Sequence, residues 1–172
     1  TQSDNTAVGY NALTANTSVD NAAFGSGALG ANTTGECNTA CGSGALDACT
    51  TGDSNTAVGY QAMTDQTTGS DNSAFGKGAL ANNTTASQNT AVGYKSGTAI
   101  TTGSQNTCMG ENSGVVLTTG DRNTIIGRDA GGQLTTGTNN CLLGHDAGKG
   151  GSPSGAITTG SNNVVLGDNS IA

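Results

Sequence analysis

A five-residue frame, Asn-x-x-x-Gly, recurs along the whole chain and constrains its fold more than any other feature. Ten copies begin at Asn5, Asn21, Asn38, Asn55, Asn72, Asn89, Asn106, Asn123, Asn140 and Asn163. Most successive copies follow one constant 17-residue spacing, while the first interval is one position shorter and the last is six positions longer. A tandem repeat of this length is typical of solenoids, in which each repeat packs only on its neighbours.

Columns of equivalent residues are numbered from the Asn of each repeat, which is position 0. Position +3 is apolar in every copy, and we expect this column to face the core: Val8, Phe24, Cys41, Val58, Phe75, Val92, Met109, Ile126, Leu143 and Leu166. Gly follows at +4, which predicts a positive φ or a close approach of two backbones. A Thr pair precedes each Asn from Asn38 onward, and Gly follows the pair in all but one repeat, where Ala86 stands.

One large apolar side chain per repeat changes its place along the chain. Position +8 is Leu13, Leu29, Leu46, Met63 and Leu80 in the first five repeats, then Gly97, Gly114, Gly131 and Gly148 in the next four. In those four repeats an aliphatic residue stands before the Thr pair (Ile100, Leu117, Leu134 and Ile157), where earlier repeats carry Asn32, Cys49, Gln66 and Asn83. A core of fixed width predicts such an exchange, because it must be filled once but not twice.

These columns predict an all-β fold: a parallel β-solenoid (β-roll) of about ten 17-residue repeats with one coil per repeat. Frequent Gly argues against helix, since each internal Gly costs about 1 kcal/mol relative to Ala. Thr-Ala-Val and Leu-Thr-Thr segments are expected to form the strands, and stacked Asn side chains to hydrogen-bond along the axis. Residues 1–172 form one repeat domain, and the six extra residues of the last interval should loop out within Gly148–Gly155.

Composition excludes several functional classes. The formal net charge is −7 with only five Lys and Arg, so no basic patch exists for nucleic acid. No apolar run approaches the length of a membrane span. No nucleophile with a base, paired acids or metal cluster is evident, so we expect no enzyme, no cofactor and no metal. Gly25-x-Gly27-x-x-Gly30 is explained by the repeat, and His145 lies in a variable, solvent-facing column.

Two sets of residues are of types that bind metals or form disulfides, but neither set requires such a site. Acidic residues cluster just before the Asn (Asp4, Asp20, Asp53, Asp71 and Asp121), but the nine-residue motif of calcium-binding β-rolls is absent. The five cysteines (Cys37, Cys41, Cys49, Cys108 and Cys141) replace small residues within columns and are expected to be buried. Their odd count and irregular spacing do not form a disulfide framework, although a Cys41–Cys49 bridge across one coil stays open.

Self-association is expected because both neighbouring strand columns are apolar. Position +2 is Ala in the first repeats and becomes larger at Ile125, Leu142 and Val165, and it points away from +3. A single coil has one interior, so we expect the Ile125–Leu142–Val165 row to be covered by a partner chain, most simply in a homotrimer. The chain also begins and ends within repeats, which predicts an interior stretch of a longer fibre or a head-to-tail filament.

The repeats "NTAVGYNAL", "NTAVGYQAM" and "NSAFGKGAL", separated by "TTGS" or "TTGD", resemble the head repeats of trimeric autotransporter adhesins and related repeats of bacteriophage tail fibres. The resemblance covers essentially the whole chain, although adhesin repeats are usually shorter than those found in this sequence. It implies three chains in left-handed parallel β-rolls around one axis, with a surface that binds host or matrix components and no catalytic residues.

The resulting hypothesis is a structural and adhesive segment of an extracellular, cell-surface or virion fibre. Tyr10, Tyr60 and Tyr94 share the column after the Gly and could present rings to a glycan or receptor, or simply cover the edge of the coil. The alternative is an ice-binding protein that uses the second Thr of each pair: Thr34, Thr51, Thr68, Thr85, Thr102, Thr119, Thr136 and Thr159. Thr is also a good strand residue, which would explain this ladder without any function.

Overall fold

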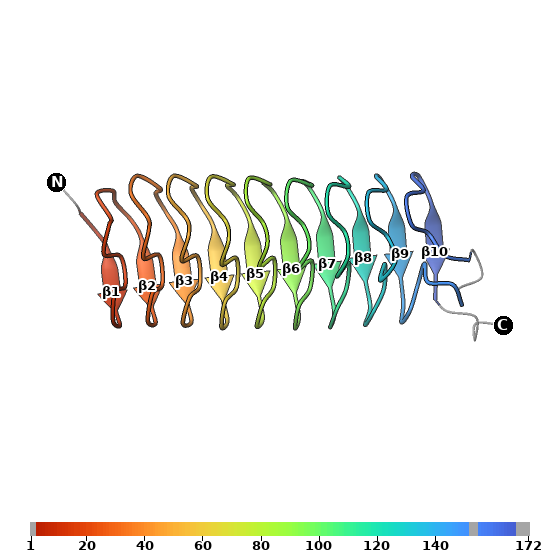
Figure 1. Ribbon diagram of the computed structural model, residues 1–172, viewed down its shortest axis with the longest axis horizontal. Coiled ribbons are helices and arrows are strands. Elements are labelled where there is room, and N and C mark those ends of the chain that lie inside the picture. Colours follow the sequence, from red (N-terminus) through yellow and green to blue (C-terminus); the bar gives the residue numbers. More distant parts are fainter. Residues whose placement is uncertain (1–2, 152–154, 168–172) are drawn as a thin grey trace.

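The computed structural model describes residues 3–151 and 155–167 and shows an all-β rod. Ten three-residue strands lie side by side in chain order in one parallel sheet (Figure 1). They are β1 (Thr6–Val8), β2 (Ala22–Phe24), β3 (Thr39–Cys41), β4 (Thr56–Val58), β5 (Ser73–Phe75), β6 (Thr90–Val92), β7 (Thr107–Met109), β8 (Thr124–Ile126), β9 (Cys141–Leu143) and β10 (Val164–Leu166). Among the described residues there is no helix, and so none that could cross a membrane. The parallel β-solenoid is therefore confirmed.

The strand register follows the repeat register without a slip. Ala40 pairs with Ala57, for example, and both lie two residues after their Asn. The shorter first interval still pairs Thr6 with Ala22, and the longer last interval still pairs Cys141 with Val164. Within the extra segment, the Ile157 N–H donates to the Gly148 carbonyl at 2.9 Å. Ser152–Ser154, the middle of the expected loop, lie outside the described residues.

The ten repeat asparagines form a continuous hydrogen-bonded ladder. Each Asn Oδ1 accepts from the backbone N–H of the Asn in the next coil, in nine bonds of 2.9–3.0 Å. Each Nδ2 from Asn5 to Asn140 donates at 2.7–2.9 Å to a backbone carbonyl just before the next Asn. From Asn21 to Asn140 these side chains are at most 2% exposed. The expected stacking of Asn along the axis is confirmed.

Backbone conformation explains two other sequence columns. At Gly25, φ is +140°, and an added Cβ would lie 2.5 Å from the Gly42 carbonyl oxygen of the next coil. The residue before each Asn has φ between 56° and 62° in all ten repeats: Asp4, Asp20, Cys37, Ser54, Asp71, Gln88, Gln105, Arg122, Asn139 and Asn162. Asp and Asn tolerate this left-handed conformation better than most residues. The polar residues before the Asn therefore serve the turn.

The core contains one large apolar group per coil from Leu29 to Leu117, as expected from the exchange at +8, but the last two full repeats bury two each: Ile125 with Leu134, and Leu142 with Ile157. Leu80 and Ile100 are both fully buried, and a Cβ added at Gly97 would lie 3.1 Å from each of their side chains. A third column takes part in the exchange, because a Cβ at Gly131 would meet Ile125 at 3.0 Å. Glycine at +8 thus also makes room for the larger residues at +2.

The expected inside and outside of the strands are reversed. Ile125 and Leu142 are 0% exposed and Val165 is 3% exposed, so this row is core and not the predicted oligomer interface. The +3 column, predicted to be core, faces outward, with Phe75 43% and Ile126 38% exposed. From the second to the fifth repeat the interior already holds the +8 side chain and the Ala before it, such as Leu29 with Ala28, so only a small residue at +2 fits beside them. A Phe pointing inward would overpack this narrow space.

The Thr pairs form bends where strands were predicted. The hydroxyl of the first Thr donates to the carbonyl of the equivalent Thr in the next coil, as from Thr67 to Thr84 at 3.0 Å. The same bond repeats from Thr33 to Thr135. These contacts hold successive coils together without regular strand geometry.

Replacing Asn72 with Ala should destabilise the rod. The Asn89 N–H, which donates to the Asn72 side chain at 3.0 Å, would be left buried and unpaired, while the Ala86 carbonyl would lose its 2.9 Å bond and keep only the Asn83 side chain at 3.3 Å. An unpaired buried group costs about 1–3 kcal/mol. The free energy of unfolding in urea measures this loss. Asn82→Ala, at an exposed side chain, is the control and should change it by less than about 0.5 kcal/mol; equal losses would contradict the ladder's role.

Candidate functional site

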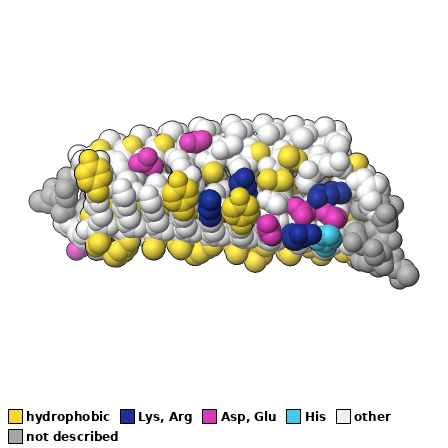
Figure 2. Space-filling view, turned by 60° about the horizontal axis from the view of Figure 1, so that its bottom comes forward, with side chains coloured by type: hydrophobic (Ala, Val, Ile, Leu, Met, Phe, Trp, Pro, Cys, Tyr) yellow, Lys and Arg dark blue, Asp and Glu magenta, His cyan; other side chains and the backbone are white. Residues whose placement is uncertain are grey.

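The outer face of the sheet is uncharged along its whole length. It consists of the +3 column and the +1 column, which share one side of each strand; together we call them the outer strand face. The +1 residues are Thr6, Ala22, Thr39, Thr56, Ser73, Thr90, Thr107, Thr124, Cys141 and Val164. A row of hydrophobic side chains follows the lower edge of the rod in Figure 2. Removing an uncharged surface from water costs less free energy than removing a charged one.

Seven of the ten residues of the +3 column are exposed, and Val58, Val92 and Leu143 are half-buried. Val8, Phe24, Phe75, Met109, Ile126 and Leu166 are each between 38% and 59% exposed. Ten strands at a spacing of about 4.8 Å give a strip about 43 Å long. Monomeric proteins rarely leave long contiguous apolar patches in water.

The second Thr of each pair forms a separate exposed ladder. All eight of these residues, from Thr34 to Thr159, are exposed. From Thr34 to Thr136 their hydroxyls make no hydrogen bond within the described part of the chain, whereas the first Thr of each pair bonds the next coil. The ladder proposed for ice binding is therefore accessible and chemically uniform.

The three predicted tyrosines are exposed but do not form one site. Tyr10 is 78%, Tyr60 50% and Tyr94 41% exposed. Tyr60 and Tyr94 lie two coils apart with Lys77 between them, its Nζ 5.6 Å and 5.9 Å from the two ring centroids. Tyr10 is three coils further toward the N-terminus and lines a different hollow, with Asp47. The sequence carried a signal for this grouping, because Tyr60, Lys77 and Tyr94 occupy the same column in successive repeats.

A groove of about 270 Å³ lies beside the Tyr60–Lys77–Tyr94 row. It spans three coils, and its walls include Gln61, Asp65, Lys77, Asn82, Lys95 and Thr98. Lys95 Nζ is 5.4 Å from the Tyr94 ring centroid. In Figure 2, large hydrophobic and basic side chains lie together near the middle of the rod. Lys77 and Lys95 were not among the site residues predicted from the sequence.

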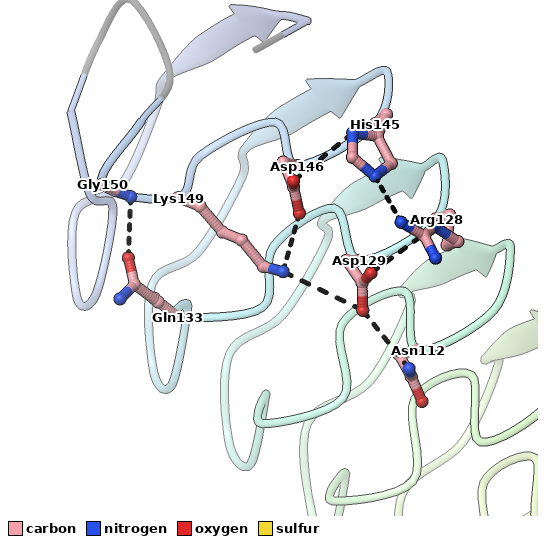
Figure 3. Close-up of polar contacts among 8 residues, drawn as sticks. All are labelled: Asn112, Arg128, Asp129, Gln133, His145, Asp146, Lys149 and Gly150. Carbon is pink, nitrogen blue, oxygen red and sulfur yellow. Dashed lines mark hydrogen bonds and ion pairs between the residues drawn. The ribbon is translucent and has the colours of Figure 1, made fainter. Parts of the chain in front are cut away.

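A charged cluster lies near the C-terminal end of the described chain (Figure 3). Potential ligand atoms of Asp129, His145 and Asp146 come within 4.8 Å of one another. Lys149 already pairs with Asp146 at 2.7 Å and lies 3.9 Å from Asp129, and it lowers the pKa of Asp146. Arg128 Nη2 lies 2.8 Å from His145 Nε2 and must donate to it. Lysine and arginine therefore supply the positive charge in this cluster.

The cysteines occupy several environments, and all five are free thiols. Cys49 and Cys108 are buried as expected, and burial raises their pKa values to about 11 and about 12. Cys37 and Cys41 are exposed, contrary to expectation, because the residue before the Asn and the +3 column both face outward. The Cys41–Cys49 bridge left open by the sequence is absent.

Comparison of the chain with protein families, with curated proteins and with solved structures gives no match. The candidate surfaces must therefore be judged on their own chemistry.

Adjacent isoleucines provide a direct test of which strand column is core. Ile125→Ala should lower the free energy of unfolding by about 2–5 kcal/mol, because it empties a packed interior. Ile126→Ala removes the same atoms from the outer strand face. In the dilute protein it should change the free energy of unfolding by about 0.5 kcal/mol or less. Denaturation of both variants in urea measures the difference. A larger loss of stability for Ile126→Ala than for Ile125→Ala would show that +3 is the core column, as expected from the sequence.

Proposed function

We propose that the chain is a rigid segment of an extracellular, cell-surface or virion fibre, such as a tail fibre or surface adhesin, with a structural and adhesive role in place of a catalytic one. The observation that carries this proposal is the outer strand face. It is uncharged, apolar along one column and as long as the sheet. A face of this kind supports assembly, while the other faces stay free for attachment.

A second copy of the same chain is the occupant that fits this face best. The apolar groups recur once per strand, at about 4.8 Å, and a partner must match this spacing along the whole strip to bury it. A second β-solenoid of the same sequence has that spacing, whereas the turns of a helix repeat at about 5.4 Å and lose register with the strands along the strip. Charge depletion is also typical of the cores of protein interfaces.

A homotrimer uses such a narrow strip efficiently. The +3 column is one side chain wide, so three copies can bring their strips to a common axis, each covering the other two. The Thr-rich +1 columns would flank that axis without burying a charge. Head-to-tail stacking is compatible with this arrangement, because it uses the ends of the coils and leaves the sides unchanged.

Phe75→Asp should dissociate the assembly without unfolding the rod. Phe75 is 43% exposed within one chain, so an Asp side chain at this position can stay in water in the monomer. Between associated chains its carboxylate would lose its water, which is unfavourable. Sedimentation velocity should show a trimer for the wild type and a monomer for the variant, with unchanged far-UV circular dichroism. Thr85→Asp, on a different exposed ladder, is the matched control and should remain trimeric. A monomeric wild type at micromolar concentration, or dissociation of both variants, would refute this assembly.

Ice binding remains the second candidate function because the whole second-Thr ladder is exposed and uncharged. A regular array of hydroxyls and methyl groups at strand spacing is the surface that this function needs. Measurement of thermal hysteresis separates the two candidates. The fibre proposal predicts none, whereas ice binding predicts hysteresis in the wild type that Thr85→Lys abolishes.

A further inference from the structure

The groove beside Tyr60 and Tyr94 concentrates positive charge in an acidic chain. Only five residues are Lys or Arg, against twelve Asp and Glu, yet two of the lysines line this one groove. Within the described residues, neither Lys77 nor Lys95 forms an ion pair with a carboxylate. By contrast, Lys149 pairs with Asp146 at 2.7 Å. The groove therefore holds two ammonium groups that make no ion pair and only one carboxylate, Asp65, so its lining carries net positive charge.

Aromatic rings position these ammonium groups without neutralising them. Lys77 lies over both Tyr60 and Tyr94, and Lys95 lies over Tyr94, at 5.4–5.9 Å from the ring centroids. Cation–π contacts of this kind contribute about 0.5–1 kcal/mol at exposed sites. They favour a fixed position for each lysine while leaving its N–H donors free for an anion.

The other walls of the groove favour hydroxyl groups beside the anion. The carboxamides of Gln61 and Asn82 make no hydrogen bond within the described part of the chain, so they can donate and accept. Asp65 can accept from a hydroxyl, and it repels a doubly charged anion such as phosphate more strongly than a singly charged carboxylate. The volume of about 270 Å³ is just below the ~300 Å³ at which pockets for drug-sized ligands begin. One sugar ring is the appropriate size.

We propose that this groove binds an acidic sugar unit of a surface glycan. Its carboxylate would lie between Lys77 and Lys95, which Tyr94 positions, and its hydroxyls would meet Gln61, Asp65 and Asn82. The inference rests on the proposed function, for which it names the attachment site. Repetition of the groove by assembly of several chains strengthens a weak contact.

The test compares two sugars that differ in one group. Glucuronate and glucose are titrated into ¹⁵N-labelled wild-type protein while the backbone amide shifts are followed. Glucuronate should shift amides of residues 60–65, 77–82 and 94–98, and glucose should not. The shifts should weaken with added salt, since the charges are partly exposed.

Charge-matched variants locate the binding. Lys77→Gln with Lys95→Gln should weaken glucuronate binding at least about tenfold, which corresponds to about 1.4 kcal/mol. Arg122→Gln with Lys149→Gln removes the same net charge elsewhere and should change the affinity less than about twofold, because distant surface charges are screened. Tyr94→Leu should also weaken binding, whereas Tyr10→Leu should not.

Three results would overturn the proposal: no binding of glucuronate, equal binding of glucose, or equal shifts with inorganic phosphate, which would show a simple anion site. Sedimentation of the same samples keeps this test separate from the fibre proposal. The lysine variants should assemble like the wild type. A monomeric wild type that binds glucuronate would refute the fibre assembly and leave the sugar site standing.

Discussion

The asparagine ladder is the constraint on which the rest of the structure depends. Its side chains pair with buried backbone groups, and each bond from a backbone N–H to an Asn Oδ1 joins one coil to the next. Loss of any one of these asparagines leaves unpaired polar groups in the interior, which lowers the stability of the fold. This requirement fixes one Asn per coil and therefore the register of all other columns. The stacked Gly column depends on the same alignment, because an added side chain at Gly25 would collide with the next coil.

Much of the fold could be predicted because the columns encode it directly. The spacing of the Asn gave the number of strands and their parallel order, and the Leu80-to-Ile100 exchange predicted how the core is filled up to Leu117, although the later repeats bury a second large residue at Ile125 and Leu142. The division between inside and outside could not be read from apolar character, since both +2 and +3 are apolar. Side-chain volume held the missing information: +2 starts as Ala and enlarges to Ile125 and Leu142 only where +8 becomes Gly.

The candidate sites were less predictable because they depend on neighbours across coils. Tyr60 and Tyr94 were recognised as exposed rings, but the groove also needs Lys77 and Lys95, which come from two different repeats. We propose separate tasks for the exposed +3 strip and for this groove: assembly with identical chains for the first and recognition for the second. A periodic rod permits both, because substitutions at outward positions leave the ladder intact.

The native cysteines offer the most direct test of the central claim that +2 is core and +3 is an assembly face. Cys41 belongs to +3, Cys108 to +2, and Cys37 is an exposed reference outside both columns. Alkylation rates should be measured for each thiol over a range of protein concentrations. The account predicts slow labelling of Cys108 throughout, constant rapid labelling of Cys37, and labelling of Cys41 that slows as the chains associate. Rapid labelling of Cys108, or a Cys41 rate independent of concentration, would contradict it.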